Sequence, residues 1–229
     1  MKPLVISHRY LMQGKLQVDN MFSQLETCVA QGFNFFETDI RRLASGEYYI
    51  SHDPQTAINE ENDARKHLDL WQKKGLMVAL NIKELGYEDD LVRFLAARGV
   101  IEQVFLFDFD IEFLKAEPQS YIDNIHKLNP NLACAVRVSD HNEPIERAVS
   151  VKGSKIIWLD EFDSQWVKKE DIERLKLAGK TVYCVAPDLH GFDHDKTIQR
   201  FKDFTAWGAD GICTDYALEL KEFLSKVAG

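Results

Sequence analysis

Short apolar runs alternate with amphipathic segments along the whole chain of 229 residues. The runs lack the two-faced alternation of a half-exposed strand, and this is typical of strands that are buried on both faces. They predict eight main strands, at residues 4–9, 33–41, 77–83, 103–110, 132–138, 155–160, 181–186 and 211–214.

Between these runs, apolar residues recur three and four positions apart, which is the spacing of an amphipathic helix. Gly32, Gly75 and Gly99 directly follow three such segments and suit the position that ends many helices. Residues 47–53 are ambiguous, because they could extend the sheet or form a hairpin arm turned at residues 45–46. Helices are expected at residues 18–31, 61–74, 88–98, 111–128, 143–149, 168–178, 196–207 and 216–227.

Eight buried strands, each followed by a helix, predict a parallel sheet covered by helices. The count favours a closed (β/α)₈ TIM barrel, formed as a single domain by residues 1–229. A doubly wound open sheet is the alternative, because the ambiguous segment leaves the strand count uncertain. The chain has neither a glycine-rich dinucleotide fingerprint nor a phosphate-loop motif to support that alternative.

Composition narrows the range of partners. Lys and Arg number 28 against 37 Asp and Glu, a formal charge of −9, and no segment concentrates Lys and Arg together with aromatic residues in the way that a nucleic-acid groove requires. A nucleic-acid partner is therefore not expected. The apolar runs are far shorter than the roughly 20 residues that span a bilayer, and none resembles a signal peptide. Four scattered cysteines without a paired motif fit a reducing compartment, so a cytoplasmic location is expected.

Polar side chains follow almost every predicted strand. In a barrel of this type, the chemistry lies at the carboxyl ends of the strands, where the following loops meet. These side chains are therefore the first candidates for a functional site. They are His8, Arg9, Glu37, Asp39, Arg41, His52, Asp53, Asn81, Lys83, Asp108, Asp110, Arg137, Asp160, Glu161, Asp188, His190 and Asp215.

Two neighbouring strands carry matching polar pairs. Glu37 and Asp39 are two residues apart, so both carboxylates point to one face and could hold a hard divalent cation. The alternative is a solvated strand end, but the apolar residues around the pair favour a buried site. Asn81 and Lys83 repeat the spacing and add an amide oxygen and an ammonium group.

Two histidines complete the predicted site. A single histidine at a strand end is more often structural, but His8 and His52 lie beside an arginine, a lysine and a carboxylate pair. Imidazoles can remove a proton from an attacking hydroxyl and return one to a leaving alkoxide. Arg9 and Lys83 could stabilise charge on phosphoryl oxygens. The set therefore favours a phosphodiester-cleaving site.

Four segments carry a family resemblance: ISHRY, FFETDIR, YYISHDP and ADGICTDY, in that order along the chain. Together they resemble the glycerophosphodiester phosphodiesterase family, within the phosphatidylinositol phospholipase C-like barrel superfamily. The resemblance implies His8 and His52 as the acid/base pair and Arg9 as a phosphate clamp. It also implies metal ligation by Glu37 and Asp39, with Mg²⁺ or Ca²⁺ as the cofactor, and a stabilising role for Lys83. Attack by a neighbouring substrate hydroxyl would give a cyclic phosphate.

The chain departs from the family pattern at several positions. Tyr10 replaces the usual glycine and is expected to narrow the mouth of the site, where it would meet substrate. Asn81 stands where the family has a third acidic metal ligand, so we expect Asp108 to restore the missing ligand or its charge. Tyr183 replaces a tryptophan that often packs against substrate, and Arg137 is a further candidate for substrate binding.

Only residues 53–80 separate His52 from Asn81, although glycerophosphodiester-type enzymes usually insert a small capping domain there. An open mouth would suit a bulky or polymeric head group, or burial by a partner, better than a small diester enclosed by a lid. The expected partner is a small-molecule or polysaccharide-linked phosphodiester substrate. Two alternatives to a metal-dependent hydrolase remain. One is a barrel that binds phosphate or sugar phosphate with little or no turnover, and the other is a lyase that stops at the cyclic product.

Overall fold

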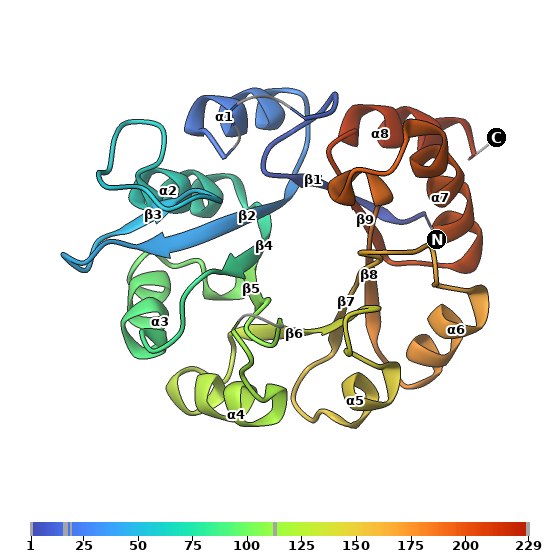
Figure 1. Ribbon diagram of the computed structural model, residues 1–229. Coiled ribbons are helices and arrows are strands. Elements are labelled where there is room, and N and C mark those ends of the chain that lie inside the picture. The colour runs from blue at the N-terminus through green and yellow to red at the C-terminus, as the bar shows by residue number, and fades with distance from the viewer. Residues whose placement is uncertain (1, 16–17, 19, 112–113, 228–229) are drawn as a thin grey trace.

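The computed structural model describes residues 2–15, 18, 20–111 and 114–227, and within them a parallel barrel is surrounded by helices (Figure 1). The barrel strands are β1 Leu4–His8, β2 Phe35–Arg42, β4 Met77–Ile82, β5 Val104–Phe107, β6 Ala133–Val138, β7 Ile156–Leu159, β8 Thr181–Val185 and β9 Gly211–Thr214. The helices are α1 Phe22–Ala30, α2 Ala64–Lys74, α3 Glu88–Ala97, α4 Pro118–Leu128, α5 Ile145–Ser150, α6 Lys169–Leu177, α7 His194–Trp207 and α8 Ala217–Lys226.

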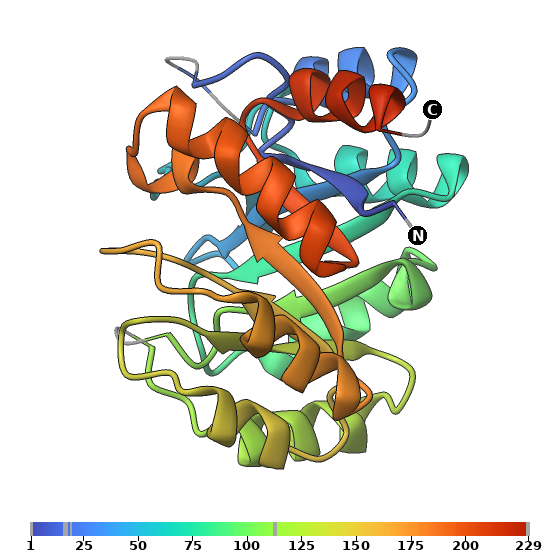
Figure 2. The same ribbon diagram turned by 90° about the vertical axis from the view of Figure 1, so that its right-hand side faces the viewer.

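The sheet closes on itself. Strand β1 pairs in parallel with β9 on one side and with β2 on the other, so the described strands leave no open barrel edge. The predicted (β/α)₈ barrel is confirmed, and the open-sheet alternative is wrong because of this closure. The loops after the strands gather at the end of the barrel opposite the chain termini (Figure 2).

The ambiguous segment forms a hairpin arm. Strand β3, Tyr48–Ile50, pairs antiparallel with the end of β2 and lies outside the barrel (Figure 1). Gly46 turns the arm with a φ of 99°, a left-handed conformation that glycine adopts without steric cost. The arm brings the loop that carries His52 beside the end of β2, because Ser51 donates its backbone N–H to the carbonyl of Asp39 at 3.1 Å.

The helix expected at residues 111–128 begins only at Pro118. Proline suits the first turn because it needs no intrahelical hydrogen-bond partner there, and the Glu117 side chain caps the helix by accepting from the backbone N–H of Ser120 at 3.1 Å. The start of the predicted segment includes residues 112–113, which lie outside the described residues. The described residues just before Pro118, 114–117, do not form a helix, and Lys115 has a φ of 55°, a left-handed conformation that a helix does not accommodate.

Two hydrophobic layers hold the barrel. The larger layer lies between strands and helices, and the smaller one fills the barrel interior with residues such as Phe35, Phe105, Trp158 and Tyr183. In this interior the Tyr183 ring stacks on Phe105 at 5.7 Å and is 8% exposed. Gly211 makes room for it, since a Cβ atom there would lie 2.9 Å from the Tyr183 ring. Tyr183 therefore fills the barrel below its mouth.

Candidate active site

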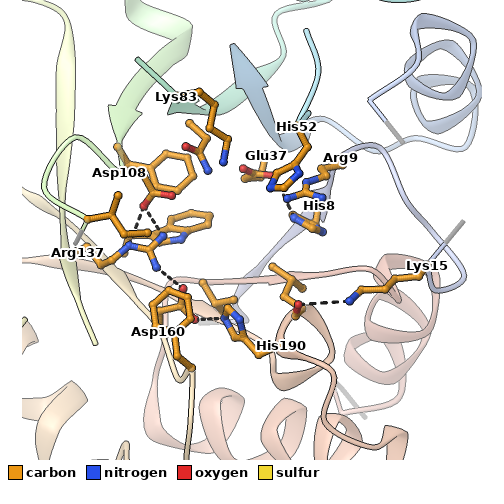
Figure 3. A pocket seen from close by; sticks show the side chains of 17 residues that line it. His8, Arg9, Lys15, Glu37, His52, Lys83, Asp108, Arg137, Asp160 and His190 are labelled. Atoms are coloured by element: carbon orange, nitrogen blue, oxygen red, sulfur yellow. Dashed lines mark hydrogen bonds and ion pairs between the residues drawn. The ribbon is translucent and has the colours of Figure 1, made fainter. Parts of the chain in front are cut away.

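A cavity of about 430 Å³ opens at the carboxyl ends of the strands, and Figure 3 shows it from close by. Ten residues predicted from the sequence line it, and they come from eight different strand ends or loops. They are His8, Arg9, Glu37, His52, Asn81, Lys83, Asp108, Arg137, Asp160 and His190. Asp39 lies buried beneath this lining. These ten predicted residues are thus brought together in one pocket.

Two features explain why these residues converge: side chains alternate between the two faces of β2, and β2 pairs in a fixed register with β1 and β4. Phe35 fills the barrel interior, so Glu37 and Asp39, at the same parity, also point inward. His8 is the cross-strand partner of Glu37, and Asn81 is the partner of Asp39. Opposite residues of paired strands lie close together, which places an imidazole and an amide directly beside the carboxylate pair.

His8 is oriented by a buried carboxylate. Its Nδ1 lies 2.5 Å from Oδ1 of Asp215, and its Nε2 lies 3.6 Å from Oε2 of Glu37. Asp215 is itself held, because Asp188 accepts its backbone N–H at 2.7 Å. With Nδ1 engaged, the ring presents Nε2 toward the pocket. The strand-end positions of Asp188 and Asp215 were visible in the sequence, but their positioning role was not.

Tyr10 does not lie in the pocket. Arg9 and Tyr10 have φ angles of 48° and 63°, so the chain turns sharply after β1 through a conformation that favours glycine. This turn sends the Tyr10 side chain outward, where its hydroxyl lies 3.1 Å from Nδ1 of His67 and its ring stacks on that imidazole. Tyr10 is 2% exposed and packs in the layer between barrel and helices, so it does not narrow the mouth.

His52 faces the pocket from the loop after β3. Its backbone carbonyl accepts from Nε of Arg41 at 2.8 Å, and its Nδ1 lies 3.0 Å from Oδ1 of Asp53. Burial lowers the pKa of the His52 imidazole, and the positive charge of Arg9 lowers it further. The side chain keeps 42% of its surface exposed. His52 is thus favoured in its neutral form at neutral pH.

The Asp39 carboxylate is fully buried and surrounded by donors. Lys83 Nζ lies 2.9 Å from Oδ1, Arg9 Nε lies 3.0 Å from Oδ2, and Asn20 donates to Oδ2 at 2.9 Å. Burial would raise the pKa of Asp39, but Lys83 and Arg9 outweigh it and hold that pKa well below its usual range. Burial, together with the neighbouring Asp39, raises the pKa of Glu37 well above its ordinary value.

A second charge network lies across the pocket from the two histidines (Figure 3). Arg137 donates to Oδ1 of Asp108, at 2.7 Å from Nε and through Nη2 as well, and to Oδ2 of Asp160 at 2.6 Å. His190 Nε2 lies 2.6 Å from the other oxygen of Asp160. Asp108 therefore engages the guanidinium of Arg137. The remaining lining includes residues not predicted from the sequence, among them Lys15, Ile111, Phe162 and Leu189.

Glu161 follows Asp160 in the sequence, but its carboxylate contacts Arg200 of helix α7 and does not line the pocket. Its carboxylate accepts from Arg200 of α7 at 2.9 and 2.6 Å, and from the backbone N–H of Val167 at 2.9 Å. Neighbouring residues of a strand end point to opposite faces, so Asp160 lines the pocket while Glu161 anchors a helix.

No protein-family model matches this chain, and no curated protein matches it. Several solved structures do match this chain. A putative glycerophosphodiester phosphodiesterase from Galdieria sulphuraria aligns with a TM-score of 0.77 at 15% identity, covering 98% of each chain. The glycerophosphodiester phosphodiesterase of Agrobacterium tumefaciens aligns with a TM-score of 0.71 at 16% identity, covering 97% of this chain and 100% of that one.

A third structure holds a product. The Oleispira antarctica phosphodiesterase in complex with sn-glycerol-3-phosphate aligns with a TM-score of 0.69 at 15% identity, covering 98% of this chain and 97% of that one. These likenesses show that the chain has the barrel fold of glycerophosphodiester phosphodiesterases, as the sequence motifs indicated.

Proposed function

We propose that this protein is a phosphoric diester hydrolase that cleaves a glycerophosphodiester-like substrate in the pocket at the mouth of the barrel. The observation that carries the proposal is the placing of two imidazoles, His8 and His52, in one pocket with the cationic side chains of Arg9 and Lys83. Acid/base groups beside cations are what phosphoryl transfer from one oxygen to another requires. The shared fold with phosphodiesterase structures supports the same activity.

The two histidines differ in environment, and this suggests their roles. His52, whose pKa is lowered by burial and by Arg9, is suited to accept the proton of an attacking hydroxyl. His8, whose Nδ1 is held by Asp215 while its Nε2 faces the pocket, is placed to pass a proton to the leaving oxygen. The attacking oxygen forms a bond to phosphorus as its proton passes to His52. The bond to the leaving alkoxide breaks as His8 protonates that oxygen.

Two of the carboxylates predicted to bind Mg²⁺ or Ca²⁺ already have partners within this chain. Asp39 is already contacted by Lys83, Arg9 and Asn20, and Asp108 by Arg137. Among residues 2–15, 18, 20–111 and 114–227, no three His, Cys, Asp or Glu side chains form a group that could hold a metal ion. Asp39 and Asp108 are thus engaged by other side chains, whereas Oε2 of Glu37 and Oδ1 of Asn81 are buried without a hydrogen-bond partner among the described residues and would be the atoms to hold a cation. The steps above use none.

The substrate class follows from the size and wall of the pocket. Its volume of about 430 Å³ suits a small molecule with a phosphate group. Phe107 and Trp158, with ring centroids 4.5 Å apart, form an apolar wall beside the polar end and could pack against the carbon skeleton of an alcohol. None of the described helices is long and apolar enough to cross a membrane.

A panel of glycerophosphodiesters tests this proposal. Purified protein is expected to release alcohol from at least one member, while His52→Ala, used as the blank, releases none. Phosphorus NMR of the product would separate the hydrolase from the lyase, because a persistent cyclic phosphate would identify a lyase. No release from any diester would favour the phosphate-binding barrel that the sequence left as an alternative.

The pH dependence of kcat/KM should report the environment of His52. A general base must be neutral, so the rate should fall as the pH drops through the pKa of His52, with a midpoint below the ordinary value of 6.5. Asp53→Asn should move this midpoint to lower pH, because the hydrogen bond that the Asp53 carboxylate accepts from the imidazole raises the pKa of His52. Initial rates across a buffer series would measure both. An acidic limb centred above 6.5 would contradict the assigned role.

A further inference from the structure

A third imidazole, that of His190, lines the pocket on the side opposite His52 (Figure 3). It ends the short 3-10 helix η2, Pro187–His190, which follows β8, and its side chain is 18% exposed. Its Nε2 lies 2.6 Å from Oδ1 of Asp160. The proposed mechanism gives this imidazole no part, although it lies in the same cavity as His8 and His52.

Asp160 decides which nitrogen of His190 carries the proton. Burial would raise the pKa of Asp160, but Arg137 and His190 outweigh it and lower that pKa below its ordinary value. The ionised carboxylate only accepts hydrogen bonds, so Nε2 of His190 must be the donor. In the neutral imidazole Nδ1 then keeps a lone pair, and it makes no hydrogen bond to any residue that the structure describes. His190 thus has one acceptor left for a ligand in the pocket.

The His190 ring is held in place before any ligand binds. It packs on the ring of Phe162, with centroids 4.4 Å apart. The loop that carries Phe162 is itself fixed, because the Asp140 carboxylate accepts the backbone N–H groups of residues 162–164 at 2.9, 3.0 and 3.0 Å. A group that its neighbours already position loses little conformational entropy when it binds a ligand. This part of the pocket is therefore suited to recognition.

The helix η2 also links His190 to the proposed proton donor. Asp188, two residues before His190, accepts the backbone N–H of Asp215 at 2.7 Å. Asp215 in turn holds Nδ1 of His8 at 2.5 Å. His190 and His8 therefore lie on one flank of the pocket, formed by β8, β9 and β1, whereas His52 comes from the loop after β3. An alcohol whose oxygen is protonated by His8 would extend along this flank toward His190.

From this we infer that His190 is a specificity-determining residue, which accepts a hydrogen bond at Nδ1 from a hydroxyl group of the leaving alcohol, and that the preferred alcohol is a polyol. The apolar wall of Phe107 and Trp158 suits the C–H groups of such an alcohol. The head group of a choline ester has no N–H or O–H hydrogen to donate, so it cannot use this acceptor. The inference rests on the proposed function, because it names the alcohol of the same substrate.

Two diesters that differ in the leaving alcohol test the inference. Glycerophosphoglycerol and glycerophosphocholine share a glycerol phosphate half, but only the first has hydroxyl groups on the other half. The unmodified protein should cleave glycerophosphoglycerol with the higher kcat/KM. His190→Phe keeps a ring against Phe162 and removes both nitrogens, so it should lower that kcat/KM about three- to tenfold, the loss of one neutral hydrogen bond. The kcat/KM for glycerophosphocholine should stay unchanged.

His141→Phe is the matched control. The His141 ring also stacks on Phe162, with centroids 4.5 Å apart, and its side chain is 33% exposed. Its Nε2 lies 2.8 Å from Oδ2 of Asp163, and His141 does not line this pocket. The variant therefore replaces an imidazole beside the same phenyl ring without removing the acceptor in the pocket. Both kcat/KM values should equal those of the unmodified protein.

Binding measurements separate this inference from the proposed function. Isothermal titration of both diesters into the His52→Ala protein, with and without His190→Phe, measures affinity without turnover. A loss of affinity confined to glycerophosphoglycerol, with no cleavage by the unmodified protein, would support the hydroxyl contact and contradict the proposed function. Cleavage of both diesters with equal effects of His190→Phe, or with none, would overturn the inference and leave the proposed function intact. A higher kcat/KM of the unmodified protein for glycerophosphocholine would also overturn it.

Discussion

His8→Ala is expected to lower the turnover of a susceptible diester by about 10²- to 10⁴-fold, the usual contribution of a positioned general acid or base. The variant removes the imidazole that Asp215 holds at 2.5 Å and that presents Nε2 toward the pocket. A leaving alkoxide would then depart without a proton donor. Single-turnover rates at saturating substrate measure the loss without interference from product release.

A matched control separates chemistry from folding. His194 lies on α7, outside the pocket, with its Nε2 2.8 Å from Oε2 of Glu219 and 46% of its side chain exposed, so His194→Ala should keep the unmodified rate. Asp215→Asn keeps the shape of the partner of His8 but not its charge, so it should lower kcat while leaving substrate binding intact. Unchanged turnover in His8→Ala would remove the proposed mechanism.

The strand pattern predicted most of the site because all strands of a parallel barrel end at the same mouth, so residues at the strand ends come together in space. Glu37 and Lys83 come from different strands, yet both were predicted to meet because each ends an inward-facing series. The same rule failed for Tyr183. Its parity is inward, but Val185, two residues later, lines the pocket, so Tyr183 lies one layer deeper in the barrel. Periodicity indicates the face of a residue and not its depth.

Residues on loops could not be predicted in this way. Lys15 and Phe162 enter the pocket from the connections after β1 and β7, which have no repeating pattern to fix their direction. Tyr10 was misplaced for a related reason. The positive φ of two successive residues reverses its side chain, and no local sequence signal marks this turn, because glycine is absent from it.

The sequence also did not show which charged residues would pair with Asp108 and Arg137. Asp108 was predicted to complete a metal site, whereas the structure pairs it with Arg137 from the adjacent strand. Arg137 was predicted to bind substrate, and it does line the pocket, but three of its guanidinium nitrogens donate to Asp108 and Asp160. This network places one cation between two carboxylates, each of which is almost fully buried. Its main contribution should therefore be to stability.

Arg137→Leu should lower the free energy of unfolding by about 3–5 kcal/mol, the usual cost of leaving a buried charge without its partner. Burial favours neutral carboxyl groups, so Asp108 and Asp160 are costly once the guanidinium is gone. Urea denaturation followed by tryptophan fluorescence measures the loss. Arg174→Leu is the matched control, because its partner Glu146 is exposed and the pair should contribute nothing measurable.

A double variant shows whether the stability lost in Arg137→Leu comes from unpaired charge or from lost packing. Asp108 has a φ of 67°, a conformation that asparagine also tolerates, so Asp108→Asn removes its charge without new backbone strain. Added to Arg137→Leu, it should recover part of the lost stability, because one of the two unpaired carboxylates disappears. If Arg137 served substrate alone, Arg137→Leu would unfold at the same urea concentration as the unmodified protein and would change only KM. Since Asp108 and Asp160 are both nearly fully buried beside it, the loss of stability should exceed any change in substrate binding.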